Sequence, residues 1–109
     1  MDDVFHALAS DARRDMVRRL AGGDLTVGQL AAPLAMSLAA ASKHVRVLER
    51  AGLVRRTVDG RRHICRLDPA PLAAAHEWLG FYQTFWAERL DTLQAMFQAE
   101  NNTKADRKP

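Results

Sequence analysis

Cysteine, long apolar runs and catalytic motifs are scarce or missing in this 109-residue chain. Cys65 is the one cysteine, so a small scaffold held by intrachain disulfides is excluded and a reducing cytoplasm is expected. No apolar run approaches the roughly 18 residues of a membrane helix. The start Met1-Asp2-Asp3 lacks the basic end and apolar block of a secretory signal. We therefore expect a cytoplasmic, globular protein with no membrane partner.

Side-chain sets that carry catalysis or hold a metal are also missing from the sequence. It has no glycine-rich phosphate loop, no Ser/His/Asp arrangement and no cluster of carboxylates, so we do not expect an enzyme. The four histidines fall on different predicted elements, and no two are spaced i, i+4 to chelate a metal. The sequence therefore predicts no catalytic residue, no metal and no cofactor.

Basic charge is concentrated in the middle of the chain. Residues 36–66 carry eight basic side chains against two acidic ones, a net charge of +6, whereas residues 1–35 carry −1 and residues 67–109 carry −2. A basic block between nearly neutral flanks favours a polyanionic partner for that block. A GC-rich genome would also raise the ratio of arginine to lysine, but it would not cluster the charge.

The hydrophobic spacing predicts four short helices in the first half of the chain. Pro33 lies inside the third and predicts a short or distorted helix there. In the fourth, Ala41, Val45 and Leu48 share one face and are expected to be buried. The four helices are Asp2–Ala9, a second that Ser10 caps and Gly22-Gly23 ends, Val27–Ala35 capped by Thr26, and Leu38–Ala51 capped by Ser37 and ended by Gly52.

Two β-rich runs and a long helix complete the predicted order. Leu53–Val58 and Arg61–Leu67 flank Asp59-Gly60, which is a strong signal for a hairpin. From Leu72 to about Gln98 we expect one helix, with a bend at Gly80 left open. The fold class is mainly α with a small β-hairpin, in the order H-H-H-H-β-β-H, which is a winged helix-turn-helix. We expect one domain over residues 1–99 and a flexible polar tail over residues 100–109.

Four segments of the chain, taken in order, match the sequence pattern of one protein family. Residues 7–14 (ALASDARR) resemble A-L-A-D-P-T-R-R, and residues 25–31 (LTVGQLA) resemble L-x-V-x-E/D-L-A. Residues 43–54 (KHVRVLERAGLV) resemble R-H-L-R-V-L-x-x-A-G-L-V, and residues 60–67 (GRRHICRL) resemble G-R-x-x-Y-Y-R-L. Together they resemble the ArsR/SmtB winged-helix repressors.

The resemblance implies a homodimeric transcriptional repressor that occupies a palindromic operator, often in its own promoter. It places Leu38–Ala51 in the major groove of double-stranded DNA and the hairpin beside the minor groove. Many members sense metals, but Thr26 and Gly28 stand where one site has Cys-x-Cys, and His76 is the one histidine of the last helix. That helix instead resembles the W-x3-Y-x2-F-W-x2-R-L-D pattern of a metal-free branch. The implied member lacks metal ligands, and its small-molecule effector is unknown.

The fourth helix and the hairpin tip supply the predicted DNA contacts. Lys43 can donate to guanine, and alanine methyl groups can pack on a thymine methyl. Arg46 and Arg50 are placed to meet phosphates, and the tip arginines to reach phosphates or a narrow minor groove. The family often has polar residues at positions 38–40, so apolar contact or DNA shape carries more of the specificity here. A merely solvated basic face is the alternative. The predicted DNA-binding residues are Ala39, Ala40, Ser42, Lys43, His44, Arg46, Arg50, Arg61 and Arg62.

Six of the seven aromatic side chains lie between Trp78 and Phe97. A helix that is apolar over so wide an arc favours packing on the first helix and on the last helix of a second chain. A two-fold dimer spaces two recognition helices about 34 Å apart, which is one turn of DNA. A small-molecule pocket at the dimer seam is the alternative. The predicted dimer-interface residues are Phe5, Trp78, Phe81, Tyr82, Phe85, Trp86 and Leu93.

Two further functions stay open at this point. The same dimer would act as a sensor if a ligand or the oxidation of Cys65 gated it, because the neighbouring basic run can stabilise a thiolate. A lone cysteine in a strand is, however, more often a small buried hydrophobe. Alternatively, the domain is a protein-interaction adaptor without specific DNA binding. The salt dependence of DNA affinity distinguishes the adaptor from the repressor.

Overall fold

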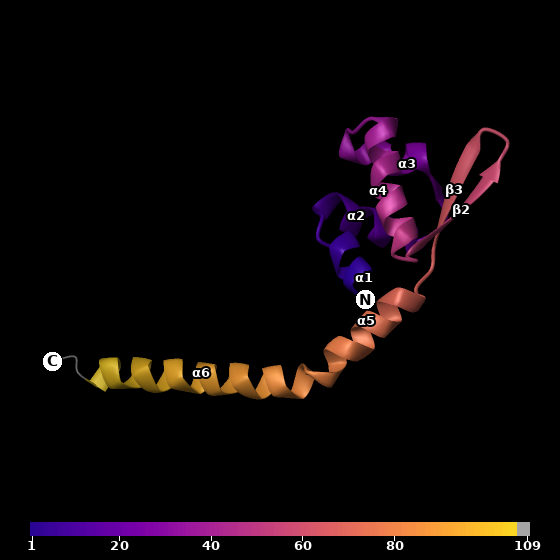
Figure 1. Cartoon of the computed structure of the whole chain (residues 1–109). Helices are drawn as coiled ribbons and strands as arrows, with labels where there is room; N and C mark the ends of the chain where they lie inside the picture. The colour runs from indigo at the N-terminus through magenta and orange to yellow at the C-terminus, as the bar shows by residue number, and fades with distance from the viewer. Residues whose placement is uncertain (107–109) are drawn as a thin grey trace. The chain divides into compact units, whose positions relative to one another are not determined.

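The computed structural model describes residues 1–106, apart from the side chains of Thr84, Trp86 and residues 102–106. The chain divides into two compact units, Met1–Ala75 and His76–Pro109 (Figure 1). The elements are α1 (Asp2–Ala7), α2 (Asp11–Leu20), β1 (Leu25–Thr26), α3 (Val27–Ala31), the 3₁₀ helix η1 (Ala32–Leu34), α4 (Leu38–Arg50), β2 (Val54–Asp59), β3 (Arg62–Leu67), α5 (Ala70–Phe81) and α6 (Gln83–Asp106).

Side-chain caps start the helices at the predicted positions. The hydroxyls of Ser10 and Ser37 each accept a hydrogen bond from the backbone N–H three residues further on, at 3.3 and 3.1 Å. At the start of α3, Thr26 and Gln29 form a reciprocal capping box: the Gln29 N–H donates to Thr26 Oγ1 at 3.1 Å, and the Thr26 N–H donates to Gln29 Oε1 at 2.8 Å. These caps satisfy backbone donors that a helix start leaves without partners.

The third helix is shortened, as Pro33 predicts. The α-helical part ends at Ala31, and η1 continues for one tight turn that contains Pro33. Ala35 then takes a left-handed conformation with φ of 51°, and the chain enters α4 through Ser37. Proline has no N–H to donate, so the α-helical ladder cannot pass through it. The predicted ends of α1 and α4 were each one or two residues too long.

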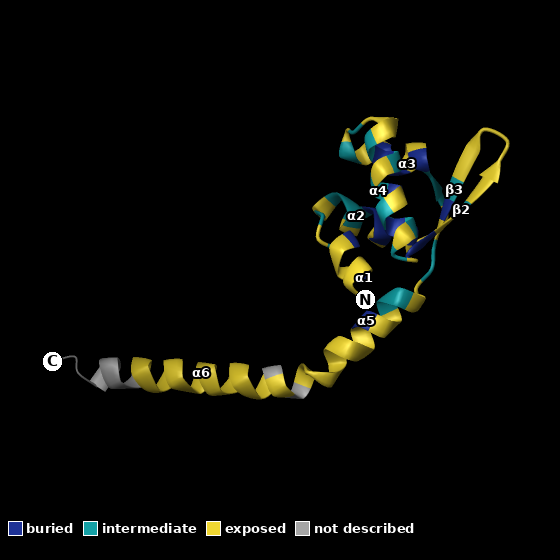
Figure 2. Ribbon diagram, viewed as in Figure 1, coloured by how far each residue is buried: buried dark blue, intermediate teal, exposed yellow. Residues whose placement is uncertain are grey.

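The core of the first unit lies between α1–α4 and the inner strand of the sheet. Ala41, Val45 and Leu48 are all fully buried, which confirms the predicted inner face of α4. Met16 of α2 and Leu30 of α3 pack in the same cluster. Figure 2 shows these buried segments in dark blue, whereas the described part of α6 is exposed along its length.

Three antiparallel strands form the sheet, in the order β1-β3-β2. The hairpin loop is Gly60-Arg61 rather than the predicted Asp59-Gly60, because Asp59 still pairs with Arg62. Gly60 has a φ of 61° in the first central position, where type II′ turns take glycine. The sequence did not reveal β1, which has two residues and pairs with the middle of β3. Two residues are too few for an alternating pattern.

The predicted single helix from Leu72 to Gln98 is wrong. The structure has two helices, α5 and α6, that meet at Tyr82. The Tyr82 N–H donates to the carbonyl oxygen of Leu79 at 3.0 Å, a tighter turn than the α-helix makes. The Tyr82 ring also lies edge-on to Trp78 and Phe81, with centroids 5.3 and 5.0 Å apart. The break is therefore at Tyr82, two residues beyond the weak point at Gly80.

The end of α6 passes the predicted domain boundary at residue 99 and reaches Asp106. Residues 107–109 of the predicted tail lie outside the described residues. Neither α5 nor α6, as far as the structure describes them, has an apolar stretch long enough for a membrane span, and the same holds for the shorter helices.

Candidate nucleic-acid interface

The outer face of α4 carries a row of exposed side chains. Ala39, Lys43, Arg46 and Arg50 are exposed on the side opposite the buried Ala41, Val45 and Leu48. Ser42 and Ala40 flank this row and are half-buried. The hydroxyl of Ser37 caps the start of the helix, and the burial of the inner face turns this row toward solvent. The structure thus brings six of the predicted DNA-binding residues onto or beside one surface of α4.

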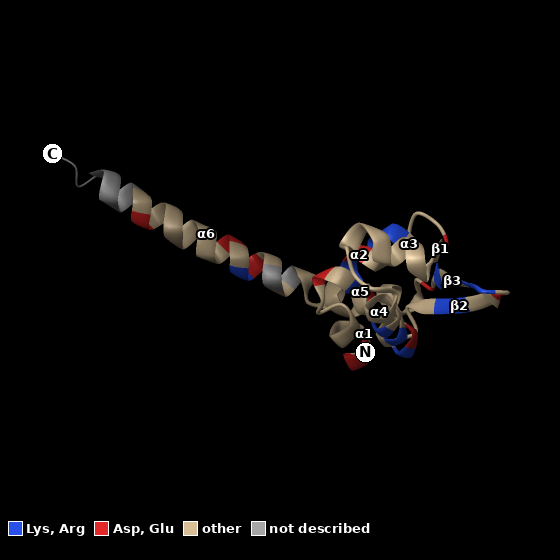
Figure 3. Cartoon of the chain, turned by 90° about the horizontal axis from the view of Figure 1, so that it is seen from above, with Lys and Arg blue, Asp and Glu red and all other residues tan. Residues whose placement is uncertain are grey.

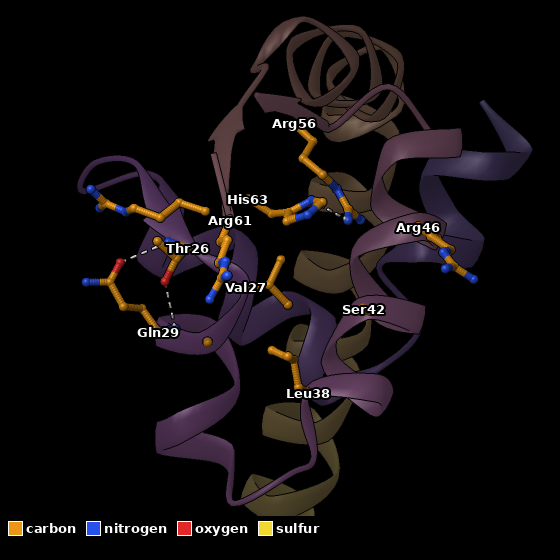
Figure 4. Close-up of a pocket in the computed structure, with 11 residues that line it drawn as sticks. Thr26, Val27, Gln29, Leu38, Ser42, Arg46, Arg56, Arg61 and His63 are labelled. Atoms are coloured by element: carbon orange, nitrogen blue, oxygen red, sulfur yellow. Dashed lines mark hydrogen bonds between the residues drawn. The ribbon is translucent and has the colours of Figure 1, made fainter. Parts of the chain in front are cut away.

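A groove of about 700 Å³ runs between α4 and the hairpin (Figure 4). Leu38, Ser42 and Arg46 line it from one edge of α4, and the capped start of α3 also lines it. Arg61 and Arg62 of the hairpin tip line the opposite side. The groove therefore joins the predicted contacts of the recognition helix to those of the wing.

The basic side chains of residues 36–66 fall into two groups. Five make no hydrogen bond or ion pair with any other described residue: Lys43, Arg46, Arg50, Arg61 and Arg62. Three are held in ion pairs at N–O distances of 3.0, 2.6 and 3.0 Å: Arg55 with Asp68, Arg56 with Glu49, and Arg66 with Asp24. The five unpartnered groups are all in the predicted DNA-binding set. Figure 3 shows the Lys and Arg residues of α4 and the hairpin in blue.

The arginines of α2 and α6 that the structure describes all have partners. Arg18 and Arg19 form ion pairs with Asp15 at 2.6 and 2.9 Å. Arg14 pairs with Asp11 in the same way. On α6, the Arg89 guanidinium lies 4.3 Å above the centre of the Phe85 ring. Among the Lys and Arg side chains that the structure describes, those without a partner are therefore confined to α4 and the hairpin tip.

Arg56 connects the hairpin to the recognition helix. Its Nη2 donates to Glu49 Oε1 at 2.6 Å, and its Nη1 lies 3.4 Å from His63 Nδ1. The Arg56 side chain is 18% exposed, so this ion pair is partly shielded from water and is screened by salt less than a surface pair. Arg56 thus positions β2 against α4. The sequence showed a basic run here but could not show which arginine has an acidic partner.

His44 lies on a different side of α4 from the exposed row. Its Nδ1 is 3.2 Å from Nη1 of Arg13, and Arg13 Nε donates to the carbonyl oxygen of Ala7 at 2.6 Å. Burial lowers the pKa of the His44 imidazole, and the positive charge of Arg13 lowers it further. The structure therefore places this predicted DNA-binding residue against α2, where it helps to join α1, α2 and α4.

The predicted dimer-interface residues are exposed wherever the structure describes them. The side chain of Trp86 lies outside the described residues. The break at Tyr82 divides the predicted stripe between α5 and α6, so it does not follow one continuous helix. The exposed fractions run from 37% for Tyr82 to 80% for Phe81 across Phe5, Trp78, Phe81, Tyr82, Phe85 and Leu93.

We next consider whether the described residues could hold a metal ion and whether Cys65 could be a reactive thiol. Among the described residues, no three His, Cys, Asp or Glu side chains gather into a set that could hold a metal. Cys65 is fully buried in β3, and burial raises the pKa of its thiol. The prediction that Cys65 is a small buried hydrophobe is confirmed, and a raised pKa disfavours the reactive thiolate.

Comparison with known proteins agrees with this geometry. A family described as a helix-turn-helix domain matches residues 8–57. The HTH-type transcriptional regulator Rv2034 of Mycobacterium tuberculosis is 39% identical over 101 residues, which cover 93% of this chain and 92% of the relative. The crystal structure of the ArsR family transcriptional regulator RHA00566 is 36% identical, with a TM-score of 0.73 over 79% of this chain and 89% of that chain. The chain belongs to the ArsR family of winged helix-turn-helix transcriptional regulators.

The assembly of one relative of this ArsR-family member is described. A winged helix-turn-helix DNA-binding domain from Mycobacterium bovis is described as homodimeric. It is 29% identical, with a TM-score of 0.61 over 76% of this chain and 80% of that chain. The homologues and the fold are those of transcriptional regulators and not of enzymes. The predicted family and fold class are confirmed.

Proposed function

We propose that this ArsR-family regulator is a homodimeric repressor that binds a palindromic operator in double-stranded DNA, including one in its own promoter. It acts in the cytoplasm, where that DNA is located, by occupying promoter sequence. One observation carries the proposal. The Lys and Arg side chains without a partner, among those that the structure describes, gather on α4 and the hairpin tip, and three of them, Arg46, Arg61 and Arg62, line one groove.

The two halves of this surface have different tasks on DNA. Arg61 and Arg62 are exposed at the wing tip and reach phosphates or a narrow minor groove. Arg46 and Arg50 lie further along α4 and bind phosphates, whereas Lys43 is near enough to the helix start to donate to a guanine edge. Phosphate contacts fix the register, and contacts near the start of α4 choose the sequence.

A second chain completes the binding unit. The exposed apolar side chains of α5 and α6 form the dimer interface, which agrees with the homodimeric state of the Mycobacterium bovis relative. Large exposed apolar patches mark protein interfaces. A two-fold axis then presents two copies of α4 about 34 Å apart, so the operator is a palindrome with half-sites one helical turn apart.

The salt dependence of DNA affinity tests the proposal, and the chain supplies a matched control. Arg61→Ala/Arg62→Ala removes two unpartnered charges from the hairpin. Arg55→Ala/Arg66→Ala removes two charges that are already paired with carboxylates, and these two residues face each other across the same strands. Both double variants have the same net charge, so a difference between them reports location rather than total charge.

We expect a steep fall in affinity with salt for the wild-type dimer. Each phosphate neutralised contributes about −0.9 to the log–log slope, so losing two contacts in each of two chains flattens the slope by about 3.6. The Arg55/Arg66 variant should keep nearly the wild-type slope. A wild-type slope near zero would exclude phosphate contact and support the adaptor instead. Equal flattening by both variants would show that net charge, not this groove, sets the affinity.

A further inference from the structure

Leu38 is an apolar residue among the mostly polar and basic residues that line the groove between α4 and the hairpin. It is the first residue of α4, follows the cap Ser37, and is 61% exposed. It lines the groove on the same edge of α4 as Ser42 and Arg46, and Figure 4 shows its side chain extending into the groove. The core of the first unit does not include Leu38. Leu38 therefore does not contribute to the core, and its exposed side chain is available to contact another molecule.

The whole first turn of α4 offers carbon and no polar side-chain atom. Leu38 and Ala39 are exposed, and Ala40 is half-buried. The Ser37 hydroxyl is engaged as the helix cap, and the next polar side chains, Ser42 and Lys43, come one turn later. In a helix-turn-helix protein, the N-terminal residues of the recognition helix approach the base edges. The contact made there by α4 must therefore be apolar.

The major groove presents one apolar feature to such a contact. Guanine, cytosine and adenine show hydrogen-bond donors and acceptors on their major-groove edges, and thymine adds its 5-methyl group. A leucine side chain over a donor or acceptor would leave that polar group without a partner, which is unfavourable. Over a thymine methyl it removes apolar surface of both molecules from water.

We propose that Leu38 is a specificity-determining residue that contacts the 5-methyl group of one thymine in each half-site. The inference rests on the proposed function, because it requires that α4 enters the major groove. The Leu38 side chain is longer than the methyl group of Ala39. It faces the protein groove between α4 and the hairpin, which Arg46, Arg61 and Arg62 also line. Binding of phosphates by those arginines brings the Leu38 side chain against the base edges.

Uracil in place of thymine is the direct probe, because the two bases differ by this methyl group alone. Wild-type protein selects binding sites from a pool of random duplexes, and the best duplex is resynthesised with each thymine in turn replaced by uracil. We expect one symmetric pair of positions at which wild-type affinity, followed by fluorescence anisotropy, falls about fourfold per methyl group lost. At that pair, Leu38→Ala should bind the thymine and uracil duplexes equally well.

Two further variants keep the test specific. Leu38→Met replaces the γ-branched side chain of leucine with an unbranched apolar side chain of similar volume and should keep the preference for thymine. Val58→Ala truncates a side chain of the wing that is 60% exposed but does not line the groove, and it should leave the ratio of thymine to uracil affinity unchanged. Thermal unfolding checks that the variants are folded.

The outcomes separate this inference from the proposed function. A pool that yields no enriched duplex, together with salt-independent binding, would overturn both. If a duplex is selected but no uracil substitution weakens wild-type binding, Leu38 does not read a methyl group, although DNA binding stands. If the uracil effect persists in Leu38→Ala, another residue of the first turn reads the thymine, and the assignment to Leu38 is wrong.

Discussion

The two compact units of the chain place their apolar side chains in opposite ways. In Met1–Ala75, fifteen apolar residues are buried in a single cluster. In His76–Pro109, no described side chain is buried, and large residues such as Phe81, Leu90 and Met96 are between 62% and 80% exposed. The first unit thus has a core of its own, whereas the second has apolar surface that a partner chain can cover. The comparison agrees with our proposal that the first unit binds DNA and that the second supplies most of the surface for self-association.

The largest effect should come from the core of the first unit. Leu48→Ala removes a fully buried side chain and should lower the free energy of unfolding by about 2–5 kcal/mol. Leu90→Ala removes an equal side chain that is 62% exposed on α6, and should change it by less than about 0.5 kcal/mol where the chain is monomeric. Urea unfolding followed by circular dichroism measures both. Equal losses would show that the two units share one core.

A charge on α6 should break the dimer without unfolding the first unit. Leu93→Glu places a carboxylate in the proposed interface and should weaken self-association at least about a hundredfold, or about 3 kcal/mol. Gln94→Glu adds the same charge to the next position on the same exposed helix and is the control. Sedimentation equilibrium measures the dissociation constants. If Leu93→Glu stays as dimeric as the control, the interface lies elsewhere.

Lys43→Ala should weaken DNA binding and leave the dimer intact, whereas Leu93→Glu should weaken the dimer. Loss of a guanine contact should cost about 1–3 kcal/mol of operator affinity and relax the preference at one base pair, with the dimer unchanged. Binding to a set of single-base operator variants measures this preference. A uniform loss over all sequences would mean that Lys43 binds phosphate instead of a base.

Much of the first unit was predictable because its signals are local. Ser37 and Gly52 mark the ends of α4, and the spacing of Ala41, Val45 and Leu48 identifies its buried face. Gly52 has a φ of 76° and the Leu53 N–H donates to the carbonyl oxygen of Leu48, the closing bond that a C-terminal glycine allows. Each of these features depends on residues a few positions apart, so the sequence alone reveals them.

The features that were not predictable depend on distant or competing contacts. Arg56, Arg55 and Arg66 look alike in sequence, and only the folded chain shows that each has an acidic partner. The break lies at Tyr82 rather than at the nearby glycine, and aromatic ring contacts and one tight hydrogen bond accompany it there. The contact of His44 with Arg13 was not predictable either, because Arg13 is on another helix and 31 positions away in the sequence.

The smallest expected effect concerns that His44 contact. Because burial and Arg13 lower the pKa of His44, the unfolded chain binds a proton that the native chain resists. This part of the stability is complete above the ordinary histidine pKa of about 6.5 and is lost as pH falls below it. We expect His44→Asn to flatten the pH dependence of unfolding between about pH 5 and 7. An unchanged pH profile would exclude His44 as its source.

The single cysteine has a practical consequence. Cys65 lies in the central strand of the sheet, opposite Leu25 on one side and Arg56 on the other, and is fully enclosed. A thiol reagent can therefore reach Cys65 only when the elements that pack around β3 separate. The rate of labelling therefore reports how often these elements separate, with no background from other thiols. Bound DNA that holds the wing in place should slow the labelling.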